Sequence, residues 1–423
     1  MAGSSRRHRE RPSQRPPSPG DLTPHATLRE VADTEKPYKK TCRASSSTSN
    51  ATSDHDVWAD LLDSLLHQII DLFVSFHDLL AFVGTCRSWR AAFSALPPAF
   101  NLSFPPLHLQ PNTDYLHLSR VYIKYSLVSK FKWRLIDPAK RTSSFRCSVP
   151  QNLRSHMCYL GCSYGYVIFS NMTHCLLVDA YGGTNVRPPK LKSARPHEIY
   201  YGTLVAPLNS PNSQLLLWTE SSLFQWQVGT NSWLEHPLHG EQILQTVLFK
   251  GEMFAMDFRE RLHTIRLSPH LSMQEVADVR RDDMFVGMSF KPWLVVCGDM
   301  LLLVHLSGRY DPLYGFSGTF KAFRLDFPVK PAKWVRMDSL GSIALFVSFD
   351  RRNPTFCCMN PERWGGKSNR IYFASPSKDS DEAWTVVEFG QVVHGIRLQS
   401  ASVHCDHLQN LWVLPSLVYG VGQ

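Results

Sequence analysis

The chain lacks the apolar segments that export or membrane insertion would require. Its first twenty residues, MAGSSRRHRERPSQRPPSPG, contain no apolar stretch of the kind that a secretory signal carries. Apolar runs such as LLLV at residues 301–304 are far too short to cross a bilayer. We therefore expect a protein of the nucleus or the cytoplasm with no membrane partner, whose cysteines remain free thiols in a reducing compartment.

Sequence signatures of catalysis are also scarce. The chain contains no H-E-x-x-H zinc motif, no phosphate-binding P-loop and no G-x-G-x-x-G after a strand. Single Ser, His and Asp residues are plentiful, but no pattern ties them together. We therefore expect a protein that is not an enzyme, with no catalytic nucleophile and no cofactor.

Large apolar residues are nearly absent from residues 1–53, which are rich in Ser, Pro and Arg. This segment holds ten Lys or Arg against five Asp or Glu, so it supplies +5 of the formal net charge of +9. Such a segment cannot bury enough surface to offset its chain entropy, and we expect a disordered basic tail. The run RRHRER at residues 6–11 is either a nuclear localisation signal or a solvated charged stretch.

Residues 54–98 predict a small helical domain. A first helix has Asp60 or Asp63 available as its N-cap, and a second begins near Asp78 and breaks at Gly84. A third ends at the two prolines at 97 and 98. Apolar residues follow the 3–4 spacing of a helical face at Leu62, Leu65, Leu66, Ile69, Ile70 and Phe73, and Cys86, Trp89, Arg90 and Phe93 repeat the i, i+3, i+4, i+7 spacing in the third helix. Three short helices bury little surface by themselves, so a partner or a neighbouring domain must cover them.

From about residue 115 the pattern changes to short β-branched and aromatic runs separated by turn residues. Strand–turn–strand units recur with their turns about 40 to 60 residues apart. That period is typical of four-stranded propeller blades, and it favours a β-propeller over a pair of β-sandwiches. The units are LLVDAYGGTNVRPP (176–189), FQWQVGTNSWLEHP (224–237), HTIRLSPHLSMQEVAD (263–278), AFRLDFPVKPAKWVRM (322–337) and YFASPSKDSDEAWTVVEF (372–389). Five turns are visible, and a further blade can be split between the two ends of the domain.

The cysteine and histidine clusters do not predict a metal site. Cys158 and Cys162 fall in a strand-like run, where residues four apart lie about 13 Å apart and cannot share one tetrahedral ion. We interpret them, with the pairs His174-Cys175 and Cys357-Cys358, as residues of the core. The same interpretation applies to the cluster at residues 404–407.

One basic stretch has the composition of a nucleic-acid surface. Residues 122–141, YIKYSLVSKFKWRLIDPAKR, interleave aromatics with six basic residues and one acidic residue. The same alternation suits an exposed strand whose basic residues face water, which is the commoner outcome. We therefore expect no nucleic-acid partner.

The helical segment resembles an F-box, whose pattern is W-x-D-L-(P)-x-x-L-L-x-x-I followed by D-L-L-x-F and C-x-S-W-R. The match spans about forty residues in the right order. Leu62 stands where the family usually has proline, which can loosen the start of the first helix. The resemblance implies docking on a Skp-type adaptor through Trp58, Leu61, Leu62, Leu65, Leu66, Ile69, Leu79, Leu80, Cys86, Trp89 and Arg90.

The remainder, roughly residues 140–420, resembles the plant F-box proteins that carry a KIB-type β-propeller. The resemblance rests on FRCSVPQNLRSHMCYLGCSYGYVIF (145–169), HCLLVDAYGGTNVRPP (174–189), KWVRMDSLGSIALFVSFD (333–350) and NRIYFAS (369–375). It implies a mainly β fold, with a tail at residues 1–53, an F-box at 54–98 and a propeller of kelch-like blades at 115–420.

The function that this resemblance implies is that of a substrate receptor in an SCF-type ubiquitin ligase. The F-box would bind the Skp adaptor and through it a cullin–RING scaffold, and the propeller would bind an unknown target protein. Two alternatives stay open. The chain can be a stand-alone interaction protein with a degenerate F-box, or a propeller enzyme or ligand binder whose helices merely pack. Burial of Leu65, Leu66 and Ile69 against the propeller would favour either alternative.

Overall fold

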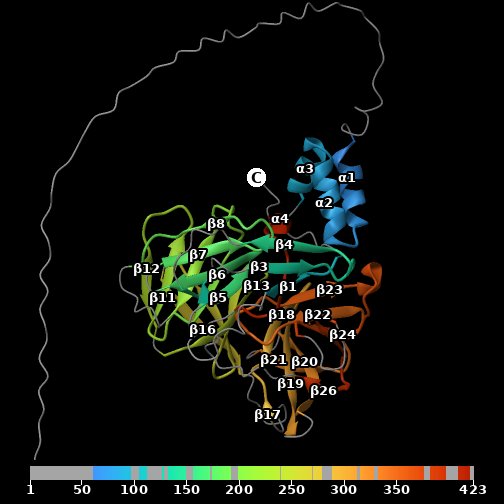
Figure 1. The fold of residues 1–423 in the computed structure, drawn as a ribbon. Helices are drawn as coiled ribbons and strands as arrows, with labels where there is room; N and C mark the ends of the chain where they lie inside the picture. The colour runs from blue at the N-terminus through green and yellow to red at the C-terminus, as the bar shows by residue number, and fades with distance from the viewer. Residues whose placement is uncertain are drawn as a thin grey trace, which may run out of the picture. The chain divides into compact units, whose positions relative to one another are not determined.

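In the residues that it describes, the computed structural model has three α-helices near the N-terminus, a six-bladed β-propeller, a 3-10 helix at Pro361–Trp364 and a short C-terminal helix (Figure 1). The mainly β fold class is therefore confirmed. The structure describes residues 61–96, 104–111, 126–127, 132–148, 156–171, 174–191, 199–238, 240–268, 270–278, 288–311, 315–327, 332–375, 382–396 and 408–419. The expected tail, Trp58, the prolines at 97 and 98 and the cluster at 404–407 lie outside these residues.

The three helices are α1 (Asp63–Asp71), α2 (Phe76–Thr85) and α3 (Arg87–Ser94). The predicted N-cap of α1 was wrong, because Leu62 holds that position and Asp63 is the first helical residue. The predicted break at Gly84 was also wrong, since α2 continues to Thr85. A glycine inside a helix costs only about 1 kcal/mol, which tertiary packing readily offsets.

The start of α2 is fixed by a reciprocal cap. The Ser75 hydroxyl accepts a hydrogen bond from the Asp78 amide at 3.2 Å, and the Asp78 carboxylate accepts one from the Ser75 amide at 3.1 Å. This capping box satisfies two backbone donors that a helix start otherwise leaves unpaired.

Each of the six sheets in the described part of the chain forms one blade. Five neighbouring strands, one from each of blades 2 to 6, lie nearest the central channel: β5, β9, β13, β18 and β23. The first three blades are formed by the following strands. Blade 1 contains β27 (Leu411–Val413), β1 (Leu107–Pro111), β3 (Lys132–Ile136) and β4 (Ser144–Ser148); blade 2 contains β2 (Ser126–Leu127), β5 (His156–Ser163), β6 (Tyr166–Asn171), β7 (His174–Asp179) and β8 (Asn185–Val186); blade 3 contains β9 (Tyr201–Leu204), β10 (Gln214–Trp218), β11 (Ser222–Gln227) and β12 (Leu234–Pro237).

Blades 4 to 6 continue around the ring. Blade 5 has two twelve-residue strands, β19 and β20, and their far halves pair with β17 and β26 beyond the blade itself. In blade 6, β22 pairs in parallel with β24 and antiparallel with β23. The strands are β13 (Ile243–Phe249), β14 (Glu252–Asp257), β15 (Arg261–Arg266) and β16 (Ser272–Asp278) in blade 4; β17 (Met288–Ser289), β18 (Trp293–Cys297), β19 (Met300–Asp311), β20 (Gly315–Asp326), β21 (Lys333–Met337) and β26 (Val392–Ile396) in blade 5; and β22 (Ile343–Val347), β23 (Phe356–Met359), β24 (Arg370–Phe373) and β25 (Thr385–Glu388) in blade 6.

The ring closes through blade 1, as the split blade expected from the sequence requires. Its strand β27 comes from the C-terminal end of the chain and pairs antiparallel with β1, with Leu107 opposite Val413. The buried Trp412 indole donates hydrogen bonds to the carbonyls of Val347 and Tyr372 in blade 6. Strand pairing thus closes blade 1 itself, and the Trp412 side chain joins it to blade 6.

An aspartate recurs in turns that follow strands of four of the blades. Asp137, Asp179, Asp257 and Asp350 each follow or end a strand, and each carboxylate accepts a hydrogen bond from the amide two residues on, at 2.8–2.9 Å. Asp side chains favour this type of turn because they replace a backbone acceptor.

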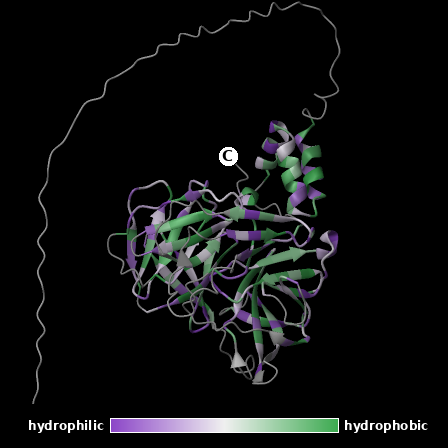
Figure 2. Ribbon diagram, viewed as in Figure 1, coloured by the Kyte–Doolittle hydropathy of each residue, from purple (hydrophilic) through white to green (hydrophobic). Residues whose placement is uncertain are grey.

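Apolar residues concentrate on the strands and on one side of the helices (Figure 2). On β3 the exposed Lys132 and Arg134 alternate with the buried Trp133 and Leu135. This confirms, for the described part of residues 122–141, a strand whose basic side chains face water.

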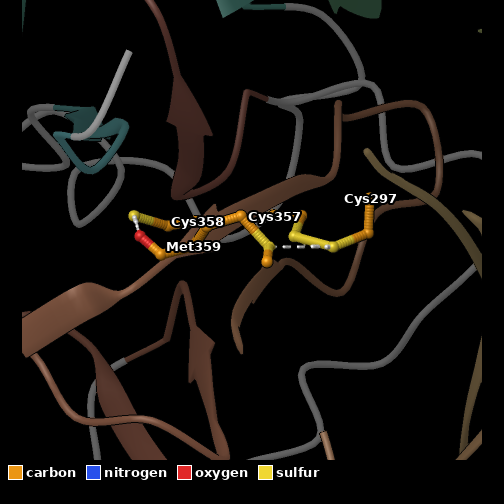
Figure 3. Close-up of a disulfide and its surroundings, with 4 residues drawn as sticks. All are labelled: Cys297, Cys357, Cys358 and Met359. Atoms are coloured by element: carbon orange, nitrogen blue, oxygen red, sulfur yellow. Dashed lines mark hydrogen bonds between the residues drawn. A yellow bond between two sulfur atoms is a disulfide. The ribbon is translucent and has the colours of Figure 1, made fainter. Parts of the chain in front are cut away.

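The expectation that all cysteines are free thiols was wrong for one pair. Cys297 on β18 and Cys357 on β23 form a disulfide that joins blades 5 and 6, with their Cα atoms 5.2 Å apart (Figure 3). Sequence spacing could not reveal this pair, because the two cysteines are 60 residues apart and meet only when the blades lie side by side. Cys358, the next residue, is buried and free.

Candidate functional site

Two leucines at the start of α1 face solvent. Leu62 is 69% exposed and Leu65 is 43% exposed, and Leu72 just after the helix is exposed as well. We call these three residues the α1 leucine face. Burying a leucine side chain is worth about 1.5–3 kcal/mol, so a partner that covers this face gains affinity from each residue.

Leu62 has a backbone suited to the proline that the F-box pattern usually carries. Its φ of −58° lies in the range to which a proline ring is limited, and its ψ is 139°. Its carbonyl accepts the amides of Leu65 and Leu66 at 2.9 and 3.1 Å. The start of α1 is therefore formed without proline.

Two residues of the predicted docking set are fully buried. Leu66 and Leu79 are both 0% exposed and belong to the same hydrophobic cluster as Phe104 and Leu107 at the start of blade 1. They support the exposed face from within, and in this structure they cannot touch a partner directly. From the sequence we expected Leu65, Leu66 and Ile69 to distinguish docking from packing by whether they are buried. Leu66 is buried and Leu65 is exposed, so these residues do not all support one function.

The other members of the set occupy intermediate positions. The Trp89 ring lies 4.7 Å from the Phe82 ring, and Cys86 Sγ accepts the Trp89 amide at 3.5 Å, which caps α3. Arg90 is exposed, and its Nε donates to the Val83 carbonyl at 3.1 Å. The half-buried residues are Leu61, Ile69, Leu80, Cys86 and Trp89.

The N-terminus of α2 is attached to blade 1 by polar contacts that the sequence did not reveal. The Asp137 carboxylate, in the turn after β3, accepts the Phe76 amide at 3.1 Å. Lys140 in the same turn forms a 2.8 Å ion pair with Asp78. A carboxylate at a helix N-terminus also interacts favourably with the helix dipole.

An aromatic cluster completes this attachment. The Phe76 ring lies 5.3 Å from Tyr181, 5.9 Å from Phe145 and 6.4 Å from Phe104, which come from blade 2, blade 1 and the segment before β1. Aromatic pairs in such tilted arrangements contribute beyond their buried area. The α1 leucine face is therefore carried by a unit that is firmly held on the propeller.

The carboxylates of Asp137 and Asp78, where α2 meets blade 1, have pKa values shifted in opposite directions. Burial raises the pKa of Asp137 despite the amide hydrogen bonds that the carboxylate accepts. Burial would also raise the pKa of Asp78, but the hydrogen bonds from Lys140 and Ser75 outweigh it, and the pKa lies below its ordinary value. The ionised Asp78 thus both caps α2 and pairs with Lys140.

Residues 161–165, GCSYG, match the G-x-S-x-G pattern of serine hydrolases. In those enzymes the serine lies on a turn between a strand and a helix. Here Ser163 ends β5 in a hairpin with β6, and its Oγ accepts the Leu204 amide at 2.7 Å. The local geometry differs from a nucleophile elbow, so the match gives Ser163 no catalytic assignment.

The interpretation of the Cys and His pairs as core residues was right only in part, because Cys158 and Cys357 are half-buried and His174, at the start of β7, is exposed. Cys162 and Cys175 lie in the core, and burial raises the pKa of the Cys175 thiol to about 12. Among the described residues, no group of three His, Cys, Asp or Glu is placed to hold a metal ion. In that same part of the chain, no helix is long and apolar enough to cross a membrane.

These observations define a six-bladed β-propeller that carries a three-helix unit with an exposed leucine face. The family model described as the KIB1-4 β-propeller matches residues 134–396, so the chain belongs to that family.

Two proteins of Arabidopsis thaliana are similar in sequence to most of this chain. F-box protein At2g26160 is 22% identical over 76% of this chain and 97% of its own length. Putative F-box protein At3g25750 is 23% identical over 84% of this chain and 97% of its own length. A solved structure, the virginiamycin B lyase from Staphylococcus aureus, aligns with a TM-score of only 0.33 at 12% identity, over 61% of this chain and 77% of that one. That likeness is too weak to transfer any function.

Proposed function

We propose that the chain is the substrate receptor of an SCF-type ubiquitin ligase. In this proposal, α1–α3 bind a Skp-type adaptor, which links the receptor to a cullin–RING scaffold, and the propeller binds the target protein. The observation that carries the proposal is the α1 leucine face, which leaves apolar side chains in water on a unit otherwise well packed. The F-box names of the two relatives support the same assignment.

The receptor itself makes and breaks no bond in this proposal. Its contribution is proximity, because holding the target on the same assembly as the activated ubiquitin raises the effective concentration of target lysines. A rigid connection between the helices and the blades would keep the bound target at a fixed distance from the activated ubiquitin. The contacts of Phe76 and Asp78 with blades 1 and 2 provide support for it.

The second candidate is a stand-alone interaction protein with a degenerate F-box. It is favoured by the complete burial of Leu66, which removes one expected docking side chain from the surface. Co-expression of the full-length chain with a plant Skp adaptor and a cullin–RING pair, followed by gel filtration, separates the two. Co-elution of all components is the result that the receptor function requires. Elution of the chain by itself would select the stand-alone protein.

A further inference from the structure

Within the described part of the chain, the loop of residues 348–355, which connects β22 to β23, crosses the central channel of the propeller. Asn353 in this loop accepts a hydrogen bond from the Tyr159 hydroxyl of β5, and the Arg352 carbonyl accepts the Cys162 amide. Thr355 donates to the Leu294 carbonyl of β18 at 2.6 Å. Blades 2 and 5 stand opposite each other in a six-membered ring, so the loop spans the channel from one side to the other.

A cavity of about 460 Å³ lies against this loop. Its walls come from the innermost strands of blades 2 to 6, and Tyr419 of α4 (Ser416–Tyr419) lines it as well. Its volume falls within the range of about 300–1,000 Å³ that ligand sites have. The loop thus forms one wall of a socket within the channel.

The lining is almost without charge. Arg352 is the one formally charged residue among the described residues that line the cavity, and the Asp350 carboxylate binds its guanidinium at 2.6–3.0 Å. Neutral polar groups include Gln245, whose amide bonds the backbone of Leu294 at 2.8–3.0 Å. A charged ligand group would lose its hydration here without gaining a partner.

Exposed apolar side chains lie on both faces of β13 beside the cavity. Leu248 lines the cavity and is 44% exposed, and the next residue, Phe249, stacks on the exposed Phe327 with ring centroids 5.6 Å apart. A small molecule held in the cavity would leave these side chains uncovered. A peptide with one apolar side chain in the cavity would cover both.

The cavity and the three helices lie at the same end of the strands. Tyr164 lines the cavity, and Tyr181 packs on Phe76 of α2. Both tyrosines belong to turns at one end of blade 2, because Tyr166 pairs with Asp179 between β6 and β7. A segment bound in the cavity is therefore on the side of the propeller that carries the α1 leucine face.

We infer that this cavity, with its rim at Leu248 and Phe327, binds an uncharged segment of the target protein anchored by an apolar side chain. The inference rests on the receptor function proposed above, since it names the surface and the kind of peptide through which the target is held.

The test uses the full-length chain as bait for a phage-displayed library of random twelve-residue peptides. Enriched peptides are synthesised, and their affinities are measured by fluorescence anisotropy for the wild type and for Leu248→Asp. Leu234→Asp is the matched control, because Leu234 is 56% exposed on the outer strand β12. Circular dichroism melting verifies that each variant is folded.

Uncharged peptides with an apolar anchor should be enriched, and Leu248→Asp should weaken their binding about tenfold or more. Phe327→Asp should act in the same direction, and Leu234→Asp should keep the wild-type affinity. No enrichment, enrichment of strongly acidic or basic peptides, or affinities that neither Leu248→Asp nor Phe327→Asp changes would overturn the inference. The assay contains no adaptor, so a failure of adaptor binding leaves its result intact.

Discussion

Lowering the pH should destabilise the propeller through a buried histidine at its closing blade. His108 on β1 is fully buried, with its ring centroid 5.5 Å from Trp384 and 5.0 Å from Trp412. Burial lowers the pKa of His108 to about 3 from an ordinary value of 6.5. The side chain is therefore neutral in the folded protein at any pH above about 3.

The sign follows from comparing the two states. As the pH falls below 6.5, the unfolded chain takes up a proton at His108 while the folded chain does not, so the unfolded state gains stability. For these two pKa values, going from pH 7.5 to pH 5 costs about 2 kcal/mol in the free energy of unfolding. The loss continues until the folded pKa is reached. Burial also lowers the pKa of His305 to about 3, so it adds a contribution of the same sign.

Urea unfolding of the wild type and of His108→Phe at pH 7.5, 6.5, 5.5 and 5 isolates this contribution. Phenylalanine keeps an aromatic ring beside the two tryptophans and cannot take up a proton. Contributions from all other groups cancel in the difference, which should shift by about 2 kcal/mol in favour of the variant between pH 7.5 and 5. A difference that does not vary with pH would refute the reasoning.

Three further outcomes follow from particular contacts. Reducing the Cys297–Cys357 disulfide, whose residues are 60 positions apart, should lower the free energy of unfolding by about 4 kcal/mol in urea titrations with and without dithiothreitol, and Cys297→Ser should abolish that difference. Asp137→Ala should lower the free energy of unfolding by about 1–3 kcal/mol, because it leaves the Phe76 amide without its acceptor. Hydrogen exchange at the Phe76 amide should be faster in Asp137→Ala than in the wild type, and slower in Asp137→Asn than in Asp137→Ala. Leu62→Pro should raise the melting temperature slightly, with a gain of about 0.4–1 kcal/mol, since φ at this position already suits proline; a lower melting temperature would contradict it.

The sequence allowed the β-propeller to be predicted because each blade repeats the same local pattern. The period of the turns and the alternation along strands such as β3 were legible from residue order alone. The split blade could also be foreseen, and strand β27 confirms it. Contacts that join distant parts of the chain could not be foreseen. The disulfide, the loop across the channel and the Asp137 contact with Phe76 each depend on how blades come together.

The docking surface was predictable only in part, because it too depends on how distant parts of the chain come together. Helical spacing identifies which leucines share a face of the helix, but it does not tell which of them a neighbouring domain buries. Leu65 and Leu66 are adjacent in the sequence, yet one is exposed and the other is fully buried in the cluster shared with blade 1. Which residues of the set bind an adaptor stays a prediction.

The dissociation constant between the full-length chain and a plant Skp adaptor tests the receptor function most directly. It should be measured side by side for the wild type, Leu65→Asp and Leu234→Asp, two substitutions at exposed leucines that leave the core intact. Leu66→Asp is unsuitable, because a charge at a fully buried position would unfold the helices. The receptor function predicts binding by the wild type and by Leu234→Asp, and a loss of at least about tenfold for Leu65→Asp. No binding by the wild type, or equal binding by all three proteins, would contradict it.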